Sequence, residues 1–221
     1  PRDAKSLSDF SVFDLKGDGE GNIWIATHNP GLEKFNIRTE QFTHIRHDKN
    51  NPASLVNDSS HALFFDRQHF LWIGTHNGLS RMDTKTGKCT NYVNDPADSL
   101  SIGKGHINSI VQDKKDRIWV GNDEDMFVLD SQSGKFKRYK IGSGSLALGC
   151  SDLDGVLWVA CNSGLYFFDQ QTDRFKKFTS QIFPEGIDGI CGLKKKKKGN
   201  LWVSTINNIL RISRERDEVK V

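Results

Sequence analysis

Polar side chains that recur in short loops after apolar segments are the residues of this chain with the clearest potential for chemistry. They are His28, Asn29, His76, Asn77, Asn122, Asp123, Asn162 and Asn207. Imidazole, amide and carboxylate groups supply the mixed hydrogen-bond donors and acceptors that a hydroxyl-rich ligand such as a sugar requires. Asparagine and aspartate are also the ordinary residues of tight turns, so turn formation alone explains the same pattern. The sequence leaves both interpretations open.

Local catalytic, phosphate-binding and metal-binding motifs are absent from the sequence. No Gly-x-Ser-x-Gly, His-Glu-x-x-His, Gly-x-Gly-x-x-Gly or Gly-x-x-x-x-Gly-Lys pattern occurs. The three consecutive acids from Asp123 to Asp125 cannot all face one ion. The cysteines form no Cys-x-x-Cys pair and are expected to be small apolar strand residues, with a disulfide as the alternative: Cys89, Cys150, Cys161 and Cys191. We therefore predict no catalytic residue, no metal site and no cofactor.

Composition and charge exclude other classes of function. The 221 residues are 36% hydrophobic and 27% charged, which is typical of a globular chain with a core. No apolar run approaches the roughly 18 residues that a membrane helix needs. The net charge of +3 is far below the excess of a nucleic-acid-binding domain, so no nucleic acid partner is predicted. The lysine run 194–198 is expected to be a solvated turn.

Five tryptophans mark an internal repeat. They are Trp24, Trp72, Trp119, Trp158 and Trp202, separated by 48, 47, 39 and 44 residues. Each stands between two apolar residues, as in Leu71-Trp72-Ile73. This period fits one four-stranded blade of a β-propeller. We expect every tryptophan to be buried between neighbouring blades, where a large flat side chain removes much apolar area from water.

The segments around each tryptophan predict strands and turns. Each period holds four short apolar segments without a helical 3.6-residue pattern, which indicates antiparallel strands. Aspartate stands six residues before four of the tryptophans, and Lys196 replaces it in the fifth repeat. Types that enter left-handed turn conformations easily follow six or seven residues after each tryptophan: Gly31, Gly78, Asp125, Gly164 and Asn208. The prediction is an all-β fold of five four-stranded β-propeller blades. They occupy about residues 8–47, 58–94, 105–141, 145–180 and 187–221 of a single propeller fragment, residues 1–221.

The combined pattern resembles the two-component regulator propeller repeat. It reads Asp-x-x-Gly-x-(Leu/Ile)-Trp-(Ile/Val)-(Gly/Ala/Ser)-Thr, then Gly-Leu, then Asp-x-x-Thr-Gly-x-Phe-x-x-Tyr, then Asn-Pro-x-Ser-Leu. The pattern is clearest from Asp66 to Tyr92 and recurs in all five repeats, with Lys196 as a departure in the fifth. The resemblance implies a fragment of a seven-bladed propeller from the periplasmic sensor region of a hybrid two-component protein.

The resemblance also implies a role in signalling rather than catalysis. Such sensors lie on the periplasmic side of the bacterial inner membrane, typically recognise oligosaccharides from glycan breakdown and signal to an attached histidine kinase. The implied partners are an oligosaccharide and the remaining blades and kinase domains of the parent protein. The alternatives are a propeller enzyme, either a lyase or a glycan-cleaving enzyme, and a protein-binding scaffold. Catalytic residues drawn from different blades would leave no local motif.

The ends of the chain align with the interior of the repeat, because Pro1 to Leu7 resembles Pro52 to Leu55 and Val219 takes the place of Phe136. We therefore expect a segment of a longer array that self-associates through exposed blade faces and strand edges. The loop from His44 to Ser60 is expected to be a polar surface loop, able to reach across the upper face or dock on a neighbouring subunit.

Overall fold

The computed structural model describes residues 6–141, 148–151, 156–161, 163–179, 185–187, 189–195, 201–213 and 218–220. Within these ranges all regular secondary structure is β-strand, and nothing in them is a helix long and apolar enough to cross a membrane. The chain divides into two compact units, residues 1–110 and 111–221, which we call unit 1 and unit 2.

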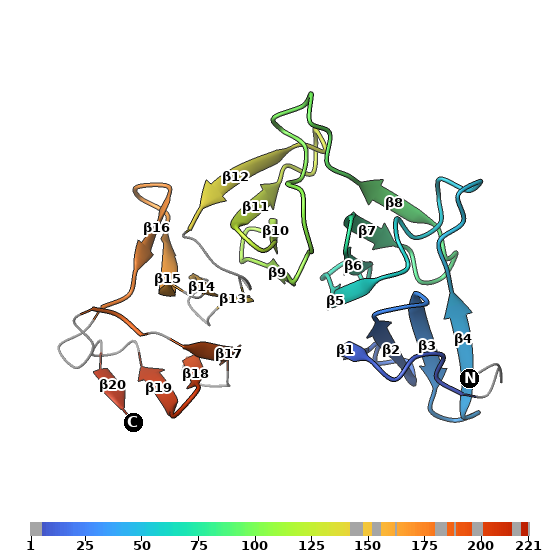
Figure 1. Cartoon of the computed structure of the whole chain (residues 1–221), viewed down its shortest axis with the longest axis horizontal. Helices are drawn as coiled ribbons and strands as arrows, with labels where there is room; N and C mark the ends of the chain where they lie inside the picture. The colour runs from blue at the N-terminus through green and yellow to red at the C-terminus, as the bar shows by residue number, and fades with distance from the viewer. Residues whose placement is uncertain are drawn as a thin grey trace. The chain divides into compact units, whose positions relative to one another are not determined.

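The strands form five sheets of four, each with its strands in sequence order (Figure 1). The first two sheets are β1 (Val12–Gly17), β2 (Asn22–Thr27), β3 (Leu32–Asn36), β4 (Gln41–Ile45) and β5 (Ser60–Phe65), β6 (Leu71–Thr75), β7 (Gly78–Met82), β8 (Cys89–Tyr92). The third and fourth are β9 (Ser109–Gln112), β10 (Ile118–Gly121), β11 (Asp125–Leu129), β12 (Phe136–Lys140) and β13 (Leu148–Ser151), β14 (Leu157–Cys161), β15 (Gly164–Asp169), β16 (Arg174–Lys177). The fifth is β17 (Ile190–Lys195), β18 (Leu201–Thr205), β19 (Ile209–Ser213), β20 (Glu218–Lys220). This architecture confirms the predicted all-β fold of four-stranded antiparallel β-propeller blades.

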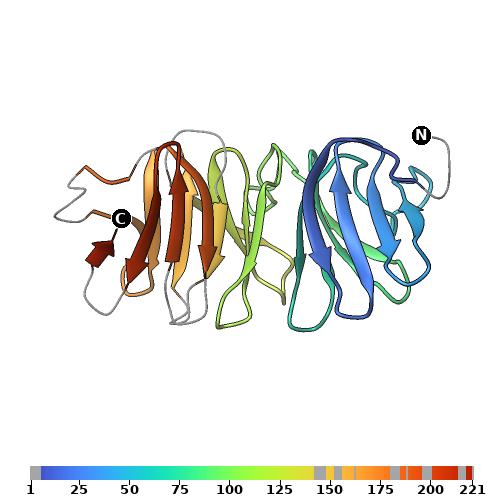
Figure 2. The ribbon, with the colours of Figure 1, turned by 90° about the horizontal axis from the view of Figure 1, so that it is seen from below.

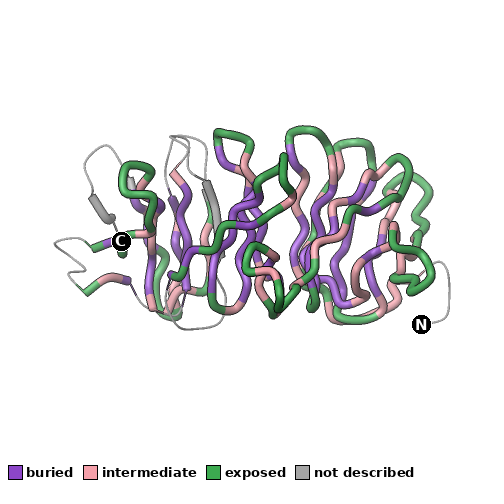
Figure 3. The backbone as a smooth tube through the Cα atoms, turned by 90° about the horizontal axis from the view of Figure 1, so that it is seen from above, coloured by how far each residue is buried: buried purple, intermediate pink, exposed green. Residues whose placement is uncertain are grey.

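Each blade has two ends, which differ in the connections that they carry (Figure 2). We call the end with the β1–β2 and β3–β4 type connections the turn end. The other end carries the β2–β3 type connection and the link to the next blade, and we call it the loop end. Within each unit the strand interiors are mostly buried, whereas exposed residues gather toward both ends (Figure 3).

The core of unit 1 joins the first two blades through Trp24. The indole of Trp24 is 2% exposed and belongs to a cluster with Leu63, Leu71 and Ile73 from the second blade. The linking loop adds Leu55, which is equally inaccessible to water. Burial of this much apolar surface is the main force that holds one blade on the next.

The cores of unit 2 repeat this arrangement. Trp119 on β10 clusters with Leu157 and Val159 of the fourth blade. Trp158 on β14 clusters in turn with Leu201 and Val203 of the fifth. In both cases the tryptophan of one blade packs against the next blade along the chain.

Trp202 departs from the expectation that every tryptophan is buried, because its side chain is only partly buried. Its neighbours Leu201 and Val203 point toward the cluster with Trp158. Successive residues of a strand face opposite sides of the sheet, so Trp202 lies on the side away from that cluster. The other four tryptophans are buried, as predicted.

In the first three blades, an aspartate at the turn end accepts a hydrogen bond from the indole N–H of the tryptophan in the same blade. Asp66 Oδ2 accepts a hydrogen bond from Trp72 Nε1 at 2.8 Å. The other oxygen of the same carboxylate accepts the backbone N–H groups of Gln68 and Phe70, both at 2.9 Å. Equivalent indole bonds join Trp24 to Asp18 at 3.2 Å and Trp119 to Asp113 at 2.9 Å.

The left-handed residue of this turn stands three positions before the tryptophan and is not the aspartate. At that position Gly21, His69 and Asp116 have positive φ, at 91°, 65° and 60°, and in the first blade Gly19 is also left-handed, at 77°. The aspartate therefore contributes hydrogen-bond acceptors rather than an unusual backbone conformation. Asp152 and Lys196, the corresponding positions of the last two repeats, lie outside the described residues.

Two glycines at the loop end are required by both conformation and space. Gly78 has a φ of 129°, and a Cβ atom there would lie 2.5 Å from the carbonyl oxygen of Tyr92. Gly31 has a φ of 109°, and its Cβ would meet the carbonyl oxygen of Ile45 at 2.4 Å. The expectation of a left-handed residue is wrong for Asp125 and Asn208, which are not among the described residues with positive φ.

The loop between the first two blades packs along the second blade. Asn91 Nδ2 donates to the carbonyl oxygens of Pro52 and Ser54 at 3.0 and 2.8 Å. The backbone N–H of Cys89 donates to the carbonyl oxygen of Ala53 at 2.8 Å. The middle of the loop is therefore held by its own unit.

Three cysteines are free: Cys89 and Cys161 are buried, and Cys191 is exposed. Burial raises the pKa of the Cys89 thiol to about 11. Cys89 thus behaves as a small apolar core residue, as expected. The side chain of Cys150 lies outside the described residues.

Candidate functional site

The described members of the predicted site all lie at the loop ends of their blades. In three blades the same backbone hydrogen bond recurs. The residue four positions after the tryptophan donates its N–H to the carbonyl oxygen of the residue thirteen positions before the tryptophan. These bonds are His28 to Ser11 at 3.2 Å, His76 to Ser59 at 2.9 Å and Ile206 to Gly189 at 3.0 Å. The bond places the β2–β3 type loop beside the start of the first strand, so side chains from both segments share one surface.

Five rings form a continuous row at the loop end of unit 1. We call Phe13, His28, His61, His76 and His106 the histidine row. The ring centroid of Phe13 lies 5.9 Å from that of His28 and 4.6 Å from that of His61. The ring of His61 stacks on that of His106 at 5.0 Å with an interplanar angle of 22°. The ring of His106 lies 4.0 Å from that of His76, and their Nε2 atoms are 3.1 Å apart. The row joins two predicted site residues, His28 and His76, which stand in different blades.

The backbone fixes the two histidines at the end of this row. Ile107 follows His106 directly, and its N–H donates to the carbonyl oxygen of Thr75 at 3.0 Å. Thr75 stands directly before His76, so this hydrogen bond holds the two histidines side by side. Gly74 permits the approach, because a Cβ atom there would lie 2.6 Å from the carbonyl oxygen of Ile107.

The rings of the row are accessible to a ligand. His28 and His76 are exposed, while His61 and His106 are half-buried. Phe13 is 49% exposed although it is a large apolar side chain. Partly exposed aromatic faces beside imidazole nitrogens combine surfaces for stacking with hydrogen-bonding groups.

The asparagines that follow the loop histidines are also exposed. The backbone N–H of Asn29 donates to Asp9 Oδ2 at 2.9 Å. Hydrogen bonds from the backbone N–H groups of Ser11 and Asn29 hold the pKa of the Asp9 carboxyl below its usual range, so Asp9 is ionised near His28. The backbone N–H of Asn77 meets Thr75 Oγ1 at 3.3 Å. Neither asparagine side chain is buried, and both stand next to a row histidine.

Asn122 in unit 2 closes a turn. It is 3% exposed, and its Oδ1 accepts the backbone N–H groups of Glu124 and Asp125 at 3.0 and 2.8 Å. In unit 1 the corresponding residue is Thr75, whose hydroxyl donates to the carbonyl oxygen of Gly78 at 2.8 Å. Asn122 in the third blade and Thr75 in the second therefore both hold the β2–β3 type loop closed. The side-chain oxygen of Asn122 is used by the loop itself.

The acidic run after Asn122 contains one buried carboxylate, Asp125, which pairs with the exposed Arg138. Asp125 is 3% exposed and accepts a hydrogen bond from Arg138 Nε at 2.7 Å. Asp123 is half-buried, and Glu124 is exposed. In the described part of the chain, no group of three or more His, Cys, Asp and Glu side chains stands ready to hold a metal ion.

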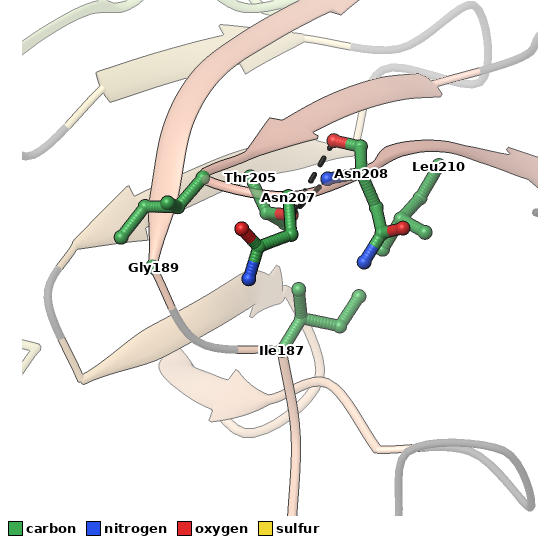
Figure 4. Close-up of a pocket in the computed structure, with 7 residues that line it drawn as sticks. Ile187, Gly189, Thr205, Asn207, Asn208 and Leu210 are labelled. Atoms are coloured by element: carbon green, nitrogen blue, oxygen red, sulfur yellow. Dashed lines mark hydrogen bonds between the residues drawn. The ribbon is translucent and has the colours of Figure 1, made fainter.

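Asn207 lines a pocket of about 360 Å³ at the loop end of the fifth blade (Figure 4). Ile187, Gly189, Ile206 and Leu210 supply most of its apolar wall. The loop is closed by Thr205, whose N–H donates to the carbonyl oxygen of Asn208 at 2.8 Å. Asn162, the remaining predicted residue, lies outside the described residues.

A buried carboxylate forms a separate cluster in the first blade. Glu33 on β3 is fully buried and accepts a hydrogen bond from Arg46 Nη2 at 2.8 Å. Ser8 and His44 contact the same carboxylate. The cross-strand pair of Glu33 with His44 corresponds to Ser80 with Asn91 in the second blade. Since Ser80 also bonds to Asn91, at 2.7 Å, this position joins strands to the linking loop in both blades, and its role is structural.

Sequence reasoning missed Phe13, His61 and His106 as site residues. Phe13 and His61 both stand eleven positions before their tryptophans, and His106 stands thirteen before Trp119. The offset from the tryptophan that Phe13 and His61 share was the available signal for those two residues, and His106 does not have it. Phe13, His61 and His106 belong to the first strand of a blade and the segment before it, whereas the predicted site residues all belong to the loops after the second strand.

Comparison with protein families identifies two of the repeats. The family model described as two component regulator propeller matches residues 54–77 and 101–124. These segments are two component regulator propeller repeats, and they contain His61, His76, Asn77 and His106. No curated protein matched the chain.

Solved structures share the fold at low sequence identity. The extracellular domain of a putative hybrid two component system from B. thetaiotaomicron superimposes with a TM-score of 0.82 and 21% identity over 96% of this chain. The extracellular domain of a putative one component system from the same organism gives 0.73 and 20% over 92%. This chain spans 28% of the length of each of these two domains. A catalytically inactive virginiamycin B lyase from Staphylococcus aureus, solved with quinupristin, gives 0.75 and 13%, and the match covers 97% of this chain and 71% of the lyase.

Proposed function

We propose that this chain is part of the extracytoplasmic ligand-sensing region of a hybrid two-component protein. The observation that carries the proposal is the match of residues 54–77 and 101–124 to the two component regulator propeller model. The fold shared with extracellular domains of such systems from B. thetaiotaomicron supports it. In this proposal the chain is catalytically silent, lies on the periplasmic side of a bacterial inner membrane and acts with the other blades and the histidine kinase of its parent protein.

The ligand in this proposal is an oligosaccharide derived from a glycan, bound at the loop end of unit 1. The histidine row offers aromatic faces for sugar rings, and the adjacent Asn29 and Asn77 offer amide groups for hydroxyls. Each such hydrogen bond adds about 0.5–1.5 kcal/mol, so several must act together with stacking to give useful affinity. In unit 2, the pocket beside Asn207 is a second place for a sugar hydroxyl.

The test is a glycan array followed by calorimetry with the complete extracellular region. His76→Ala and Asn77→Ala should each weaken binding. The matched control is His69→Asn, because His69 is an exposed histidine at the turn end of the same blade and asparagine tolerates its φ of 65°. Saturable binding that neither loop variant weakens would move the site elsewhere.

Two other outcomes would change the class of protein. Turnover of a polysaccharide or lactone panel would make it an enzyme, and the fold shared with virginiamycin B lyase makes such a panel worthwhile. Capture of a protein partner, with no binding to any glycan, would indicate a scaffold.

A further inference from the structure

Two imidazoles of the histidine row make a direct polar contact. His76 Nε2 and His106 Nε2 lie 3.1 Å apart, and the two rings are tilted by 54°. At this distance the groups on the two Nε2 atoms, a proton or a lone pair on each, are in direct contact. Two N–H groups, or two lone pairs, that face each other at this distance repel, so the neutral pair is favoured when one Nε2 donates its proton to the other.

This spacing also suits two ligands of one metal ion. Bonds of about 2.0–2.1 Å in a tetrahedral arrangement place two ligating nitrogens about 3.3–3.4 Å apart. A shift of a few tenths of an ångström would bring the observed pair to that separation. On binding, the donor imidazole moves its proton from Nε2 to Nδ1, and both Nε2 lone pairs then face the ion.

The backbone keeps the two nitrogens together without a metal. The hydrogen bond from Ile107 N to Thr75 O, at 3.0 Å, lies next to both histidines. Ile107 is fully buried, which anchors the segment that carries His106. A pair that is already positioned loses little conformational freedom on binding, which favours affinity.

We propose that His76 and His106 bind one divalent transition-metal ion through their Nε2 atoms. Imidazole is a preferred ligand of Zn²⁺, Ni²⁺ and Cu²⁺. Two imidazoles fill two of the four positions of a tetrahedral ion, so the other positions are open for water or for an oxygen atom of a bound molecule. His61 stacks on His106 and is the nearest further imidazole that a side-chain rotation could bring to the ion. This site goes beyond the proposed recognition of sugars and does not depend on it.

The experiment is calorimetric titration of the full, metal-free chain with Zn²⁺, Ni²⁺ or Cu²⁺ alone at neutral pH, where most imidazoles are deprotonated. One site is expected. His76→Ala and His106→Ala should each lower its affinity by about tenfold or more. His69→Asn, at the turn end of the same blade, should leave it unchanged.

A second measurement covers the case in which a variant misfolds. Electron paramagnetic resonance of the Cu²⁺-loaded wild type should show coupling to two imidazole nitrogens. Absence of metal binding, binding that survives in the His76→Ala/His106→Ala double variant, or a spectrum without imidazole coupling would each overturn the proposal. No sugar is present, so these results are separate from the glycan tests.

Discussion

The turn end and the loop end of the blades are built on opposite plans. At the turn end, blades one to three use the same parts, an aspartate that binds the backbone and the indole six residues later. At the loop end the equivalent position varies along the chain, with His28 and His76 in the first two blades, Asp123 in the third and Ile206 in the fifth. The repeated end closes each blade, while the varied end presents different side chains on a common backbone. The exposed polar side chains of the loop end can therefore change with little effect on folding, whereas the aspartate and the tryptophan that it bonds cannot.

The tryptophan between the two ends should give the largest effect. Trp119 is fully buried among Leu157, Val159 and Phe168, so Trp119→Ala leaves a cavity between two blades. We expect a loss of about 3–5 kcal/mol in the free energy of unfolding. Chemical denaturation measures it. Trp202→Ala is the matched control and should cost less, because Trp202 is only partly buried. Equal losses would contradict the packing of Trp119 against the fourth blade.

Removal of the turn-end aspartate should give the next largest effect. Asp66→Ala leaves the buried indole N–H of Trp72 and two backbone N–H groups without their acceptor. We expect a loss of about 1–3 kcal/mol in unfolding free energy. Asp83→Ala is the control, since the carboxylate of Asp83 accepts backbone bonds at an exposed turn and touches no tryptophan. If Asp66→Ala lost no more unfolding free energy than Asp83→Ala, the hydrogen bond to the indole would add nothing to the stability of the fold.

A glycine at the loop end tests whether that end has any fixed part. Gly78→Ala combines a φ of 129° with a Cβ 2.5 Å from the carbonyl oxygen of Tyr92, and should cost about 1–3 kcal/mol. Gly87→Ala separates the two causes, because Gly87 has a φ of 73° with nothing within 4 Å of its Cβ. Thermal unfolding of both variants should rank Gly78→Ala as the less stable. The reverse order would show that the close approach is relieved by a small shift.

Acid should weaken the turn end through Asp18. Burial raises the pKa of Asp18, but hydrogen bonds from Asn22, Glu20 and Trp24 outweigh it and hold the pKa below the usual value. A lowered pKa in the folded state stabilises the protein above the unfolded pKa of about 3.9, and this stability is lost as the pH falls through the folded pKa. The stability difference between wild type and Asp18→Asn should therefore shrink as the pH drops below about 4. Urea unfolding over a pH series measures it, and a constant difference would exclude this role.

The smallest effect on folding is expected from the loop histidines. His76→Ala removes an exposed ring that lies outside the core cluster around Trp24, so the free energy of unfolding should change by no more than about 0.5 kcal/mol. Thermal unfolding checks this, with ligand and metal binding measured on the same sample. A large loss of stability would show that the histidine row is a structural feature, and the distinction between the two ends would then fail.

The sequence by itself determined the blades. The spacing of the five tryptophans, the apolar triplets around them and the turn residues between them predicted four-stranded sheets, because each repeat needs a large side chain at one height to pack on the next blade. Fixed local chemistry of this kind is visible within one period. The same reading gave Gly31 and Gly78 as left-handed turn residues, because only glycine enters that conformation without strain.

Tertiary structure decided which polar residues meet. Local spacing could not show that His106 lies against His76, thirty positions away, because a hydrogen bond between segments far apart in sequence, Ile107 to Thr75, brings them together. The tertiary structure also decided that Asn122 Oδ1 accepts hydrogen bonds from the backbone of its own turn, while His28 and His76 remain exposed. Asparagine and histidine look alike as loop residues in a sequence. Only the backbone around them determines which side chain stays free to contact a ligand, since burial and hydrogen bonding are properties of the folded chain.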